Sequence, residues 1–573
     1  MRRMRALLLL LAAAPALAGI EVEVRGLKGE EEDNVKLRLG IVNAAGRSDL
    51  DDNLVQRLHQ RANDDIRSAL QPFGYYSPQI DGDLSGSAPD WRAVYQVQPG
   101  PVTEVRKVEV LVEGEGAGME ELKPALKRLQ RREGKPLDHA LYEEAKATLL
   151  SSAIGLGFLD ARYTRAELRV YPEEQHADVA LTLDTGARWY FGAVALEAQR
   201  LDPELVQRYV QILEGQPFES RLLLDTQFAL ADLEYFDDIE IEPQRDKAVA
   251  RHIPVRIYTT LRKRAHYDLG LGYGTDTGAR ISAGAEFRRL NRRGHKVRAD
   301  LRLSQIKNTF GAEYRIPLGR RAGEQLSFTA GAASEQFEDG DSKKYSVGAG
   351  LSRILGDWQR RIYLQFEHEK SRLGADLETS DLLMPGLALN RSRLDDPIHT
   401  RSGWAVFADL HGAHRNALST ASFLQVRTVA RVAVPVPFER RARLLGRVEY
   451  GASLVDEFSE LPASQRFFAG GDQSVRGYKY QSIGPRDAQG RVIGGKYLST
   501  YSLELDYPVW HNWGAALFYD AGGAGDDPGP KLFQGAGVGL RYRAPVGFVR
   551  VDVAQPLDGD GSVRLHLGVS VGL

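Results

Sequence analysis

The residues best suited to specific chemistry are one arginine in a long glycine-rich segment and two acidic residues that follow it. The segment covers residues 466–485, and Arg476 is the one charge in its core, Ser-Val-Arg-Gly-Tyr at 474–478. A planar guanidinium group suits bidentate contact with a carboxylate. Glu504 and Asp520 are the downstream acids that we expect to pair with it. The pattern indicates an ion-pair site that positions a loop.

Other motif-like patterns in the chain do not add up to a catalytic or metal site. Residues 568–572 have the G-x-S-x-G spacing of a nucleophile elbow, but they lie in an alternating strand pattern with no acid and histidine downstream. His411 and His414 form an isolated H-x-x-H with no carboxylate placed beside them. We therefore expect no catalytic residue, no metal and no cofactor, and a protein that is not an enzyme.

The glycine-rich segment is set between alternating strand patterns that run from residue 264 to the end of the chain. Apolar and polar residues alternate in short segments separated by Gly, Asp, Asn and Pro turns, which is typical of an outer-membrane β-barrel. We expect sixteen strands, near 264–275, 279–291, 295–306, 309–318, 323–336, 343–354, 357–369, 380–393, 401–411, 420–434, 440–452, 496–507, 513–522, 532–543, 547–556 and 563–572.

A soluble β-sandwich is the alternative to a barrel, and two features weigh against it. Tyr507, Trp510 and Trp513 cluster around an expected short turn at Pro508, as in an interfacial aromatic girdle. Charged residues occupy the strand face opposite the apolar one, where a packed sandwich core could not bury them unpaired. These predicted lumen-facing residues are Arg427, Arg431, Arg447, Glu449, Arg541, Arg550 and Asp552.

The longest connection of the expected barrel, residues 453–495, contains Arg476. A loop this long is normally functional or disordered, and its aromatic and glycine residues indicate a packed loop. If the loop folds back into the barrel, Arg476 can reach Glu504 and Asp520, which the strand alternation turns toward the lumen. The residues alone leave open a second arrangement, in which Arg476 lies on an exposed extracellular loop.

The first half of the chain mixes helical and strand patterns that recur about every 80 residues. The landmarks Phe-Gly-Tyr-Tyr at 73–76, Leu-Gly-Phe-Leu at 156–159 and Leu-Glu-Tyr-Phe at 233–236 each follow an amphipathic helical stretch. Such a period predicts three similar β-α-α-β-β domains, and three unrelated small domains are the alternative. The expected domains are residues 19–101, 102–186 and 187–262, followed by the barrel at 263–573.

Composition limits the compartment and the partners. The chain has 573 residues, a formal net charge of −2 and no cysteine. Neither half is strongly basic, which gives no support for nucleic-acid binding. Residues 1–18 combine three arginines, an apolar run and a small-residue cleavage site, which predicts a secretory signal peptide. No later apolar run is long enough for a spanning helix, whereas barrel strands need only about 9–11 alternating residues.

Several motifs together resemble the BamA/TamA superfamily of outer-membrane assembly proteins, which have periplasmic POTRA domains and a 16-stranded barrel. The resemblance covers essentially the whole chain after residue 18. In that superfamily the Val-Arg-Gly-Tyr loop enters the lumen and its arginine contacts acids of the inner wall, which implies Asp520 and Glu504 as partners of Arg476. The residues that carry the resemblance are Gly470, Gly471, Val475, Arg476, Gly477 and Tyr478 in the loop, Phe518, Asp520 and Gly522, and the runs 396–404, 503–509 and 541–547.

Three repeats instead of five resemble the TamA branch of the superfamily. That branch implies an insertion and translocation factor for unfolded outer-membrane β-barrel clients, such as autotransporters, with a TamB-like inner-membrane-anchored partner bound through the POTRA domains. The barrel would contact the lipid bilayer, and the POTRA domains would lie in the periplasm. A two-partner-secretion pore and an outer-membrane esterase are the alternatives, although we find neither the plug helix of the first nor the catalytic set of the second.

A route for clients follows from closing the expected barrel. Its first strand, near 264–275, must meet its last, near 563–572, whose glycines at 568 and 572 indicate a short and weakly paired seam. An open seam exposes strand edges that can template a client strand. Cysteines at 268 and 567 are expected to lock it. The chain ends in Leu573, where many such barrels end in Phe or Trp, so an atypical seam is expected.

Overall fold

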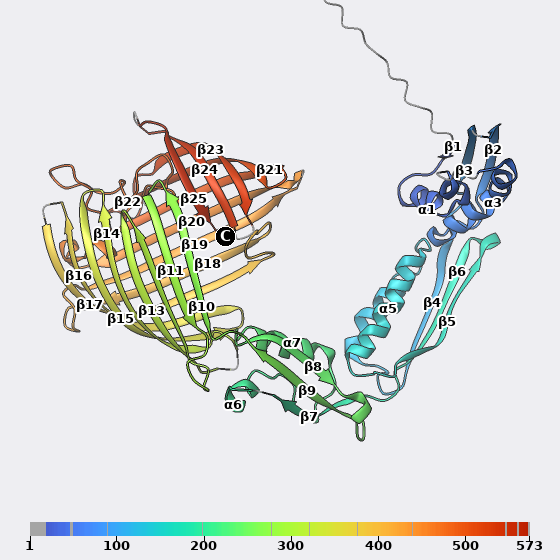
Figure 1. Cartoon of the computed structure of the whole chain (residues 1–573), viewed down its shortest axis with the longest axis horizontal. Helices are drawn as coiled ribbons and strands as arrows, with labels where there is room; N and C mark the ends of the chain where they lie inside the picture. The colour runs from blue at the N-terminus through green and yellow to red at the C-terminus, as the bar shows by residue number, and fades with distance from the viewer. Residues whose placement is uncertain are drawn as a thin grey trace, which may run out of the picture. The chain divides into compact units, whose positions relative to one another are not determined.

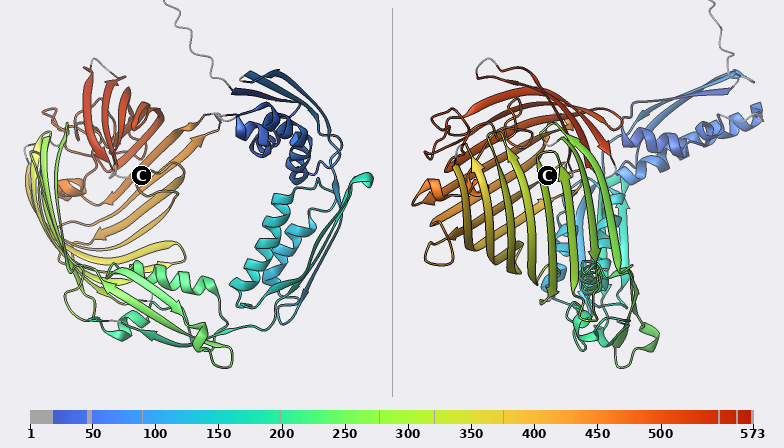
Figure 2. Two further views of the ribbon diagram at one scale, coloured as in Figure 1. Left: turned by 45° about the vertical axis from the view of Figure 1, so that its right-hand side comes forward. Right: turned by 60° about the vertical axis from the view of Figure 1, so that its left-hand side comes forward.

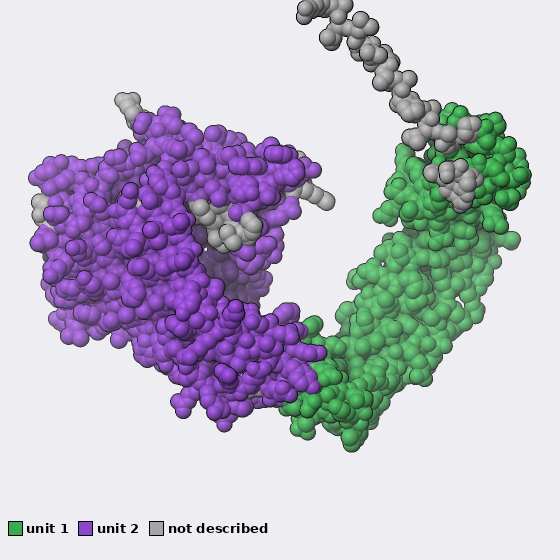
Figure 3. All heavy atoms as spheres, in the orientation of Figure 1, with its two compact units in different colours: residues 1–195, 212–224, 242–256 green, residues 196–211, 225–241, 257–573 purple. Residues whose placement is uncertain are grey.

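The computed structural model describes residues 19–570 except 46–49, 89, 198, 277, 320, 375, 438, 545–546 and 559–560. The predicted signal peptide and the C-terminal residue Leu573 lie outside the described residues. The chain divides into two compact units, coloured in Figure 3. One unit comprises residues 1–195, 212–224 and 242–256, and the other comprises residues 196–211, 225–241 and 257–573. Among the described residues, no helix is long and apolar enough to cross a membrane.

Three small domains of the expected β-α-α-β-β order precede the barrel (Figure 1). Each forms a three-stranded sheet in which the last strand lies in the middle, in the orders β1-β3-β2, β4-β6-β5 and β7-β9-β8. The first domain has an additional short helix. The elements are β1 Gly19–Arg25, α1 Glu30–Arg38, α2 Gly40–Ala44, α3 Asp52–Leu70, β2 Gln79–Ser87, β3 Asp90–Gln98, β4 Glu104–Glu113, α4 Lys123–Gln130, α5 His139–Gly155, β5 Arg162–Tyr171, β6 His176–Asp184, β7 Tyr190–Leu196, α6 Pro203–Gln207, α7 Ser220–Ala231, β8 Phe236–Pro243 and β9 His252–Leu261.

The long helix of the first domain shows why these elements form. Asp51 caps α3 by accepting a hydrogen bond from the Leu54 amide at 2.6 Å, which satisfies one of the unpaired donors at the helix start. Val55, Ala62 and Ile66 are fully buried at helical spacing and pack on alternate residues of β1 and β3. Asp138 caps α5 of the second domain in the same way.

The three sequence landmarks mark a junction that recurs from domain to domain. The Gly74 carbonyl accepts from the Thr103 amide, the Gly157 carbonyl from the Trp189 amide, and the Tyr235 carbonyl from the Arg262 amide, at 2.8–2.9 Å. Each amide donor lies near the start of the domain that follows, the last of them just before the barrel. The spacing of about 80 residues between the landmarks therefore reflects the same hydrogen bond at three successive domain junctions.

The second half of the chain forms one sheet of sixteen antiparallel strands in sequence order, from β10 to β25. The strands lie side by side and curve into a barrel in the views of Figures 1 and 2. They are β10 Ala265–Gly274, β11 Gly278–Phe287, β12 Lys296–Ser304, β13 Lys307–Pro317, β14 Gln325–Phe337, β15 Gly340–Leu355, β16 Trp358–Leu373, β17 Asp376–Leu394, β18 Gly403–Ala413, β19 Phe423–Val436, β20 Glu439–Val455, β21 Tyr497–Trp510, β22 Trp513–Gly525, β23 Phe533–Ala544, β24 Gly547–Pro556 and β25 Arg564–Ser570.

The strand prediction is confirmed in number, order and face. On β21, Tyr501, Leu503 and Leu505 are exposed, whereas Asp506 on the opposite face is buried. A barrel in lipid presents its apolar side chains outward and its polar ones to the lumen, and this alternation matches that requirement.

The expected turn at Pro508 is wrong. Pro508 lies inside β21 opposite Gly514, and the chain turns at residues 511–512. The register shifts between Pro508 and Trp510, which marks a bulge. Proline lacks an amide donor, and a bulge is one of the few places where a sheet accepts it.

The connection between β11 and β12 contacts the third small domain and identifies the end of the barrel nearest to it. The buried Tyr235 hydroxyl donates to the Gly294 carbonyl at 2.5 Å. Lys296 forms an ion pair with Glu234 at 2.9 Å. Because successive connections alternate between barrel ends, the β10–β11, β20–β21 and β24–β25 connections all lie at the opposite end.

Candidate functional site

The connection between β20 and β21, residues 456–496, packs against the inner face of the barrel, and we call it the lumen loop. Its chain doubles back through isolated bridges between Phe467 and Gly495 and between Ala469 and Ile483. Val475 is fully buried and joins a small apolar cluster with residues of β21 and β22. The Tyr478 hydroxyl donates to the Gln534 carbonyl at 3.2 Å. These contacts exclude the alternative of an exposed loop for the Arg476 segment.

Arg476 meets the two carboxylates that the sequence placed on the lumen face. Its Nε donates to Asp520 Oδ2 at 2.7 Å and its Nη2 to Asp520 Oδ1 at 2.9 Å, a bidentate pair. Its Nη1 donates to Glu504 Oε2 at 2.8 Å. The Arg476 amide also donates to Asp520, at 3.1 Å. Because Asp520 holds both backbone and side chain, it fixes the direction of the loop as well as its depth.

A third carboxylate and a second arginine complete the cluster. Arg476 Nη1 also donates to Asp552 Oδ2 at 3.0 Å. Arg541 donates to Glu504 Oε1 at 2.7 and 3.0 Å and forms an ion pair with Asp552. We call these five residues the arginine cluster; two cations face three anions. Breaking one pair in such a buried network leaves a charge uncompensated and costs about 3–5 kcal/mol.

The surroundings of Arg476 favour its charged form. Only 3% of Arg476 is exposed. Burial opposes ionisation, but the hydrogen bonds and charge of Asp520, followed by the charges of Glu504 and Asp552, raise the pKa of Arg476 above its ordinary value. The guanidinium carbon also lies 3.5 Å from the ring centre of Phe518, a cation–π contact. The side chain therefore acts as a fixed structural charge.

A glycine of the barrel wall allows the loop backbone to come close. A Cβ atom at Gly535 of β23 would lie 2.1 Å from the carbonyl oxygen of Arg476. No side chain fits at that distance, so this position of the barrel wall requires glycine. The segment that approaches this glycine is the lumen loop.

The remaining motif residues lie around the same cluster. Gly470 and Gly471 both adopt positive φ at the turn that precedes Val475, and Gly522 of β22 lies against the Val475 side chain. The Gly477 amide donates to His566 Nε2 at 2.9 Å. The structure thus brings together the whole predicted residue set.

Sequence reasoning missed part of the cluster. Asp552 and Arg541 were expected to face the lumen, as they do, but not to bind Arg476 and its partners. The alternation along the strands already placed Asp552 on the lumen face. In the structure it lies opposite His566 of β25 and opposite Gly539 of β23. Pairing with the loop depends on how far the strands are staggered around the barrel, and no local pattern encodes that distance.

The two histidines of the H-x-x-H pattern are bound separately. His411 contacts Asp409 and Gln465, and His414 contacts Ser422. Within the described residues, one His/Asp group has ligand atoms close enough to surround an ion, namely Asp276, Asp472 and His566. Those atoms already bond to one another or to the loop backbone.

The seam between the first and last barrel strands differs from every other strand junction. β10 and β25 are the two ends of the sheet order, and no strand ladder joins them in the described part of the chain. The Leu567 amide donates to Thr275 Oγ1 at 3.4 Å. Extending an antiparallel register from this contact places Ser570 opposite Gly272. Residues 265–271 of β10 therefore have no described β25 residue opposite them, and the expected lock between 268 and 567 is misplaced.

Comparisons with known proteins agree with this architecture. Residues 290–571 match the Omp85 superfamily domain, and residues 21–99 match the POTRA domain TamA domain 1. The outer membrane protein assembly factor BamA of Nitratidesulfovibrio vulgaris is 23% identical over 419 residues, covering 69% of this chain and 52% of that protein. The factor of the same name from Neisseria meningitidis serogroup B is 24% identical over 431 residues, covering 67% and 53%.

A solved structure shows the same fold. BamA from Haemophilus ducreyi lacking POTRA domains 1–3 superimposes with a TM-score of 0.65 at 15% identity, covering 82% of this chain and 99% of that chain. The chain spans about half the length of the curated relatives it matches.

The fold and the site define a class: an outer-membrane β-barrel preceded by POTRA domains, with an arginine-bearing loop docked in its lumen. The chain carries an Omp85 superfamily domain behind a TamA-type POTRA domain.

Proposed function

We propose that this protein is a non-enzymatic assembly factor that inserts and translocates outer-membrane β-barrel clients through the seam between β10 and β25. The observation that carries the proposal is the seam itself, where two strands of a sixteen-stranded sheet end without a described ladder between them. Unpaired strand edges are templates for another strand.

The chemistry of the seam suits a client that has not yet folded. A client strand can add to the edge of β10 by β-augmentation, which supplies main-chain hydrogen bonds without reading sequence. Leu269 and Leu271 on β10 are 87% and 86% exposed, so the adjoining surface is apolar. The free energy of client folding drives insertion, and the arginine cluster keeps the wall next to the last strand, β21 to β24, in a fixed shape.

The small domains are proposed to work in the periplasm. They receive clients and bind an inner-membrane-anchored, TamB-like partner through their sheet edges. The match of residues 21–99 to the TamA POTRA domain 1 supports this partner. Crosslinking through the first domain followed by co-purification tests it. Recovery of a large exported adhesin in place of an inner-membrane protein would favour a two-partner-secretion pore.

A thiol lock at the correct register tests the seam. The chain has no cysteine, so an introduced pair is chemically unique. Thr275→Cys with Leu567→Cys uses the two residues that are in contact across the seam. Crosslinking this pair should block client insertion, and reduction should restore it. The matched control is Ile281→Cys with Leu303→Cys, an outward-facing pair between the joined strands β11 and β12.

Two results would overturn the proposal. One is full client insertion by the crosslinked Thr275–Leu567 variant, with crosslinking verified by mass spectrometry. The other is labelling of the purified protein by a serine-hydrolase probe, which would revive the esterase alternative.

A further inference from the structure

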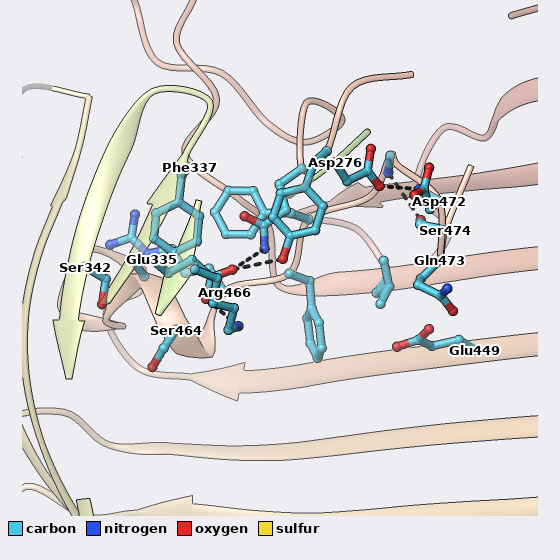
Figure 4. A pocket seen from close by; sticks show the side chains of 18 of the residues that line it. Asp276, Glu335, Phe337, Ser342, Glu449, Ser464, Arg466, Asp472, Gln473 and Ser474 are labelled. Atoms are coloured by element: carbon cyan, nitrogen blue, oxygen red, sulfur yellow. Dashed lines mark hydrogen bonds and ion pairs between the residues drawn. The ribbon is translucent and has the colours of Figure 1, made fainter. Parts of the chain in front are cut away.

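Asp472 of the lumen loop contacts both sides of the seam. Toward the first strand, its amide donates to Asp276 Oδ2 at 2.5 Å, and Thr275 Oγ1 donates to Asp472 Oδ1 at 3.4 Å. Toward the last strand, its carboxylate forms an ion pair with His566 of β25. Figure 4 shows Asp472 beside Asp276 at the edge of a cavity of about 640 Å³. One loop residue thus joins the β10–β11 connection, just after the first strand, to the last strand, and no described ladder joins those two strands.

The His566 side chain is held at both ring nitrogens by the loop. Its Nε2 accepts from the Gly477 amide at 2.9 Å, so its Nδ1 is the atom that donates to Asp472. His566 is buried. The last strand is therefore bonded to the lumen loop on its inner face, next to the arginine cluster.

The approach of the loop to the first strand is equally close. A Cβ atom at Gly471 would lie 2.5 Å from Asp276 Oδ2, and the φ angle of Gly471 is +102°. Glycine meets both requirements, a left-handed backbone and the absence of a side chain. The Asp472 carbonyl also accepts from Arg550 of β24 at 3.4 Å. The position of Asp472 is thus fixed from three directions.

We propose that Asp472 is a latch that holds the seam closed at the end far from the third small domain for as long as the lumen loop is docked. The inference rests on the proposed function, because a latch matters only if the seam opens. Asp472 is a positioning residue: it acts through Asp276, Thr275 and His566 and touches no client. Opening the seam requires either breaking its bonds or moving the loop.

The charges around the latch give it a pH dependence. Burial, and then the like charge of Asp472, raise the pKa of Asp276 to about 6. Acidification below that value removes the repulsion between the two acids. Arg564 of β25 also faces Asp276. Arg280, Arg550 and Tyr480 line the same cavity. The latch should therefore tighten between pH 8 and pH 5.5.

Spin labels across the seam measure the latch directly. Full-length protein in lipid nanodiscs carries labels on Tyr273→Cys and Leu565→Cys, both outward-facing residues near the far end of the seam. Asp472→Ala should lengthen and broaden the distance distribution and raise the open-to-closed ratio roughly tenfold, as expected for loss of charged hydrogen bonds. Asp487→Ala is the matched control, a loop acid that pairs with Arg491.

A conservative variant separates the latch from a general packing role. Asp472→Asn keeps the amide donor to Asp276 and an oxygen that accepts from His566. It should restore a closed seam at pH 8 and abolish the tightening at pH 5.5. Asp276→Ala leaves the bond between Asp472 and His566 intact and should widen the seam as Asp472→Ala does. Folding of each variant is checked by heat-modifiable gel mobility. If Asp472→Ala does not fold, Asp276→Ala replaces it in the test.

Unchanged label distances in both alanine variants would overturn the latch. Client insertion is measured separately in the same nanodiscs. A widened seam with unaltered client insertion would support the latch and contradict the proposed function. Unchanged seam distances with altered client insertion would contradict the latch and leave the proposed function supported.

Discussion

Arg476 and Asp520 lie 44 residues apart in the chain and form two parallel side-chain hydrogen bonds of 2.7 and 2.9 Å inside the barrel. Asp520 is almost completely buried and also accepts from the Arg476 amide and from Ser502. This pair places a long connection at one position on the inner wall.

Removing the Arg476 guanidinium should release the loop while leaving the barrel intact. Arg476→Ala leaves three buried carboxylates facing Arg541 alone, at a cost of about 3–5 kcal/mol for loop docking. Arg476→Lys keeps the positive charge but loses the planar guanidinium that binds Asp520 through two hydrogen bonds, so it should restore loop docking only in part. Limited proteolysis of the folded barrel measures release. Arg491→Ala, which removes a partly exposed pair with Asp487 in the same loop, should behave as wild type.

Filling the gap in the wall should have a similar effect without any change of charge. Gly535→Ala would place a methyl group 2.1 Å from the Arg476 carbonyl, and overpacking of this kind costs about 1–3 kcal/mol. We expect faster proteolysis of the lumen loop and slower client insertion. Gly529→Ala, in the β22–β23 connection with open space around its Cβ, should change neither. If the lumen loop resists proteolysis equally in the Gly535→Ala and Gly529→Ala variants, the loop does not contact β23.

Acid should favour the docked loop. Because the docked-state pKa of Asp276 is raised to about 6, its contribution is fully present below its ordinary pKa near 4 and is lost as pH rises through 6, by at most about 3 kcal/mol. Asp276→Asn removes this charge. At pH 8 the variant should resist proteolysis as the wild type does at pH 5. A wild-type protection profile that falls on acidification would contradict the sign of this effect.

Clients should be captured at the first strand. A photo-crosslinking residue at Leu269, 87% exposed on β10, should trap a client during insertion. The same residue at Leu503 of β21, outward-facing and 51% exposed, should trap lipid. The readout is a client-sized adduct on a gel. Equal trapping at both positions would show that clients do not use the seam.

Much of this fold was accessible from sequence because its signals are local. A period of two residues fixes which side of a strand faces lipid, so the sequence alone places Glu504 and Asp520 on the lumen face. Turn residues fixed the strand ends to within a few positions. The repeated landmarks predicted three domains because each repeats the same junction hydrogen bond.

The errors lie where distant parts of the chain must be aligned. The contact of Asp552 with Arg476 depends on strand stagger, and the contact of Thr275 with Leu567 depends on how the last strand meets the first. Pro508 sits in a bulge, which is a property of two paired strands and is invisible in one. Local patterns therefore determine direction and spacing but not register between distant segments.

The unequal seam has a consequence for the cell envelope. Its contacts with the lumen loop gather at one rim, and the half of β10 nearest the third small domain pairs with β11 but has no described β25 residue on its other side. If the seam opens as proposed, it should part first at the rim next to the third small domain. Under that proposed function the other rim would stay closed in the early steps, so that a new barrel could enter the outer membrane without opening a leak to antibiotics or detergents.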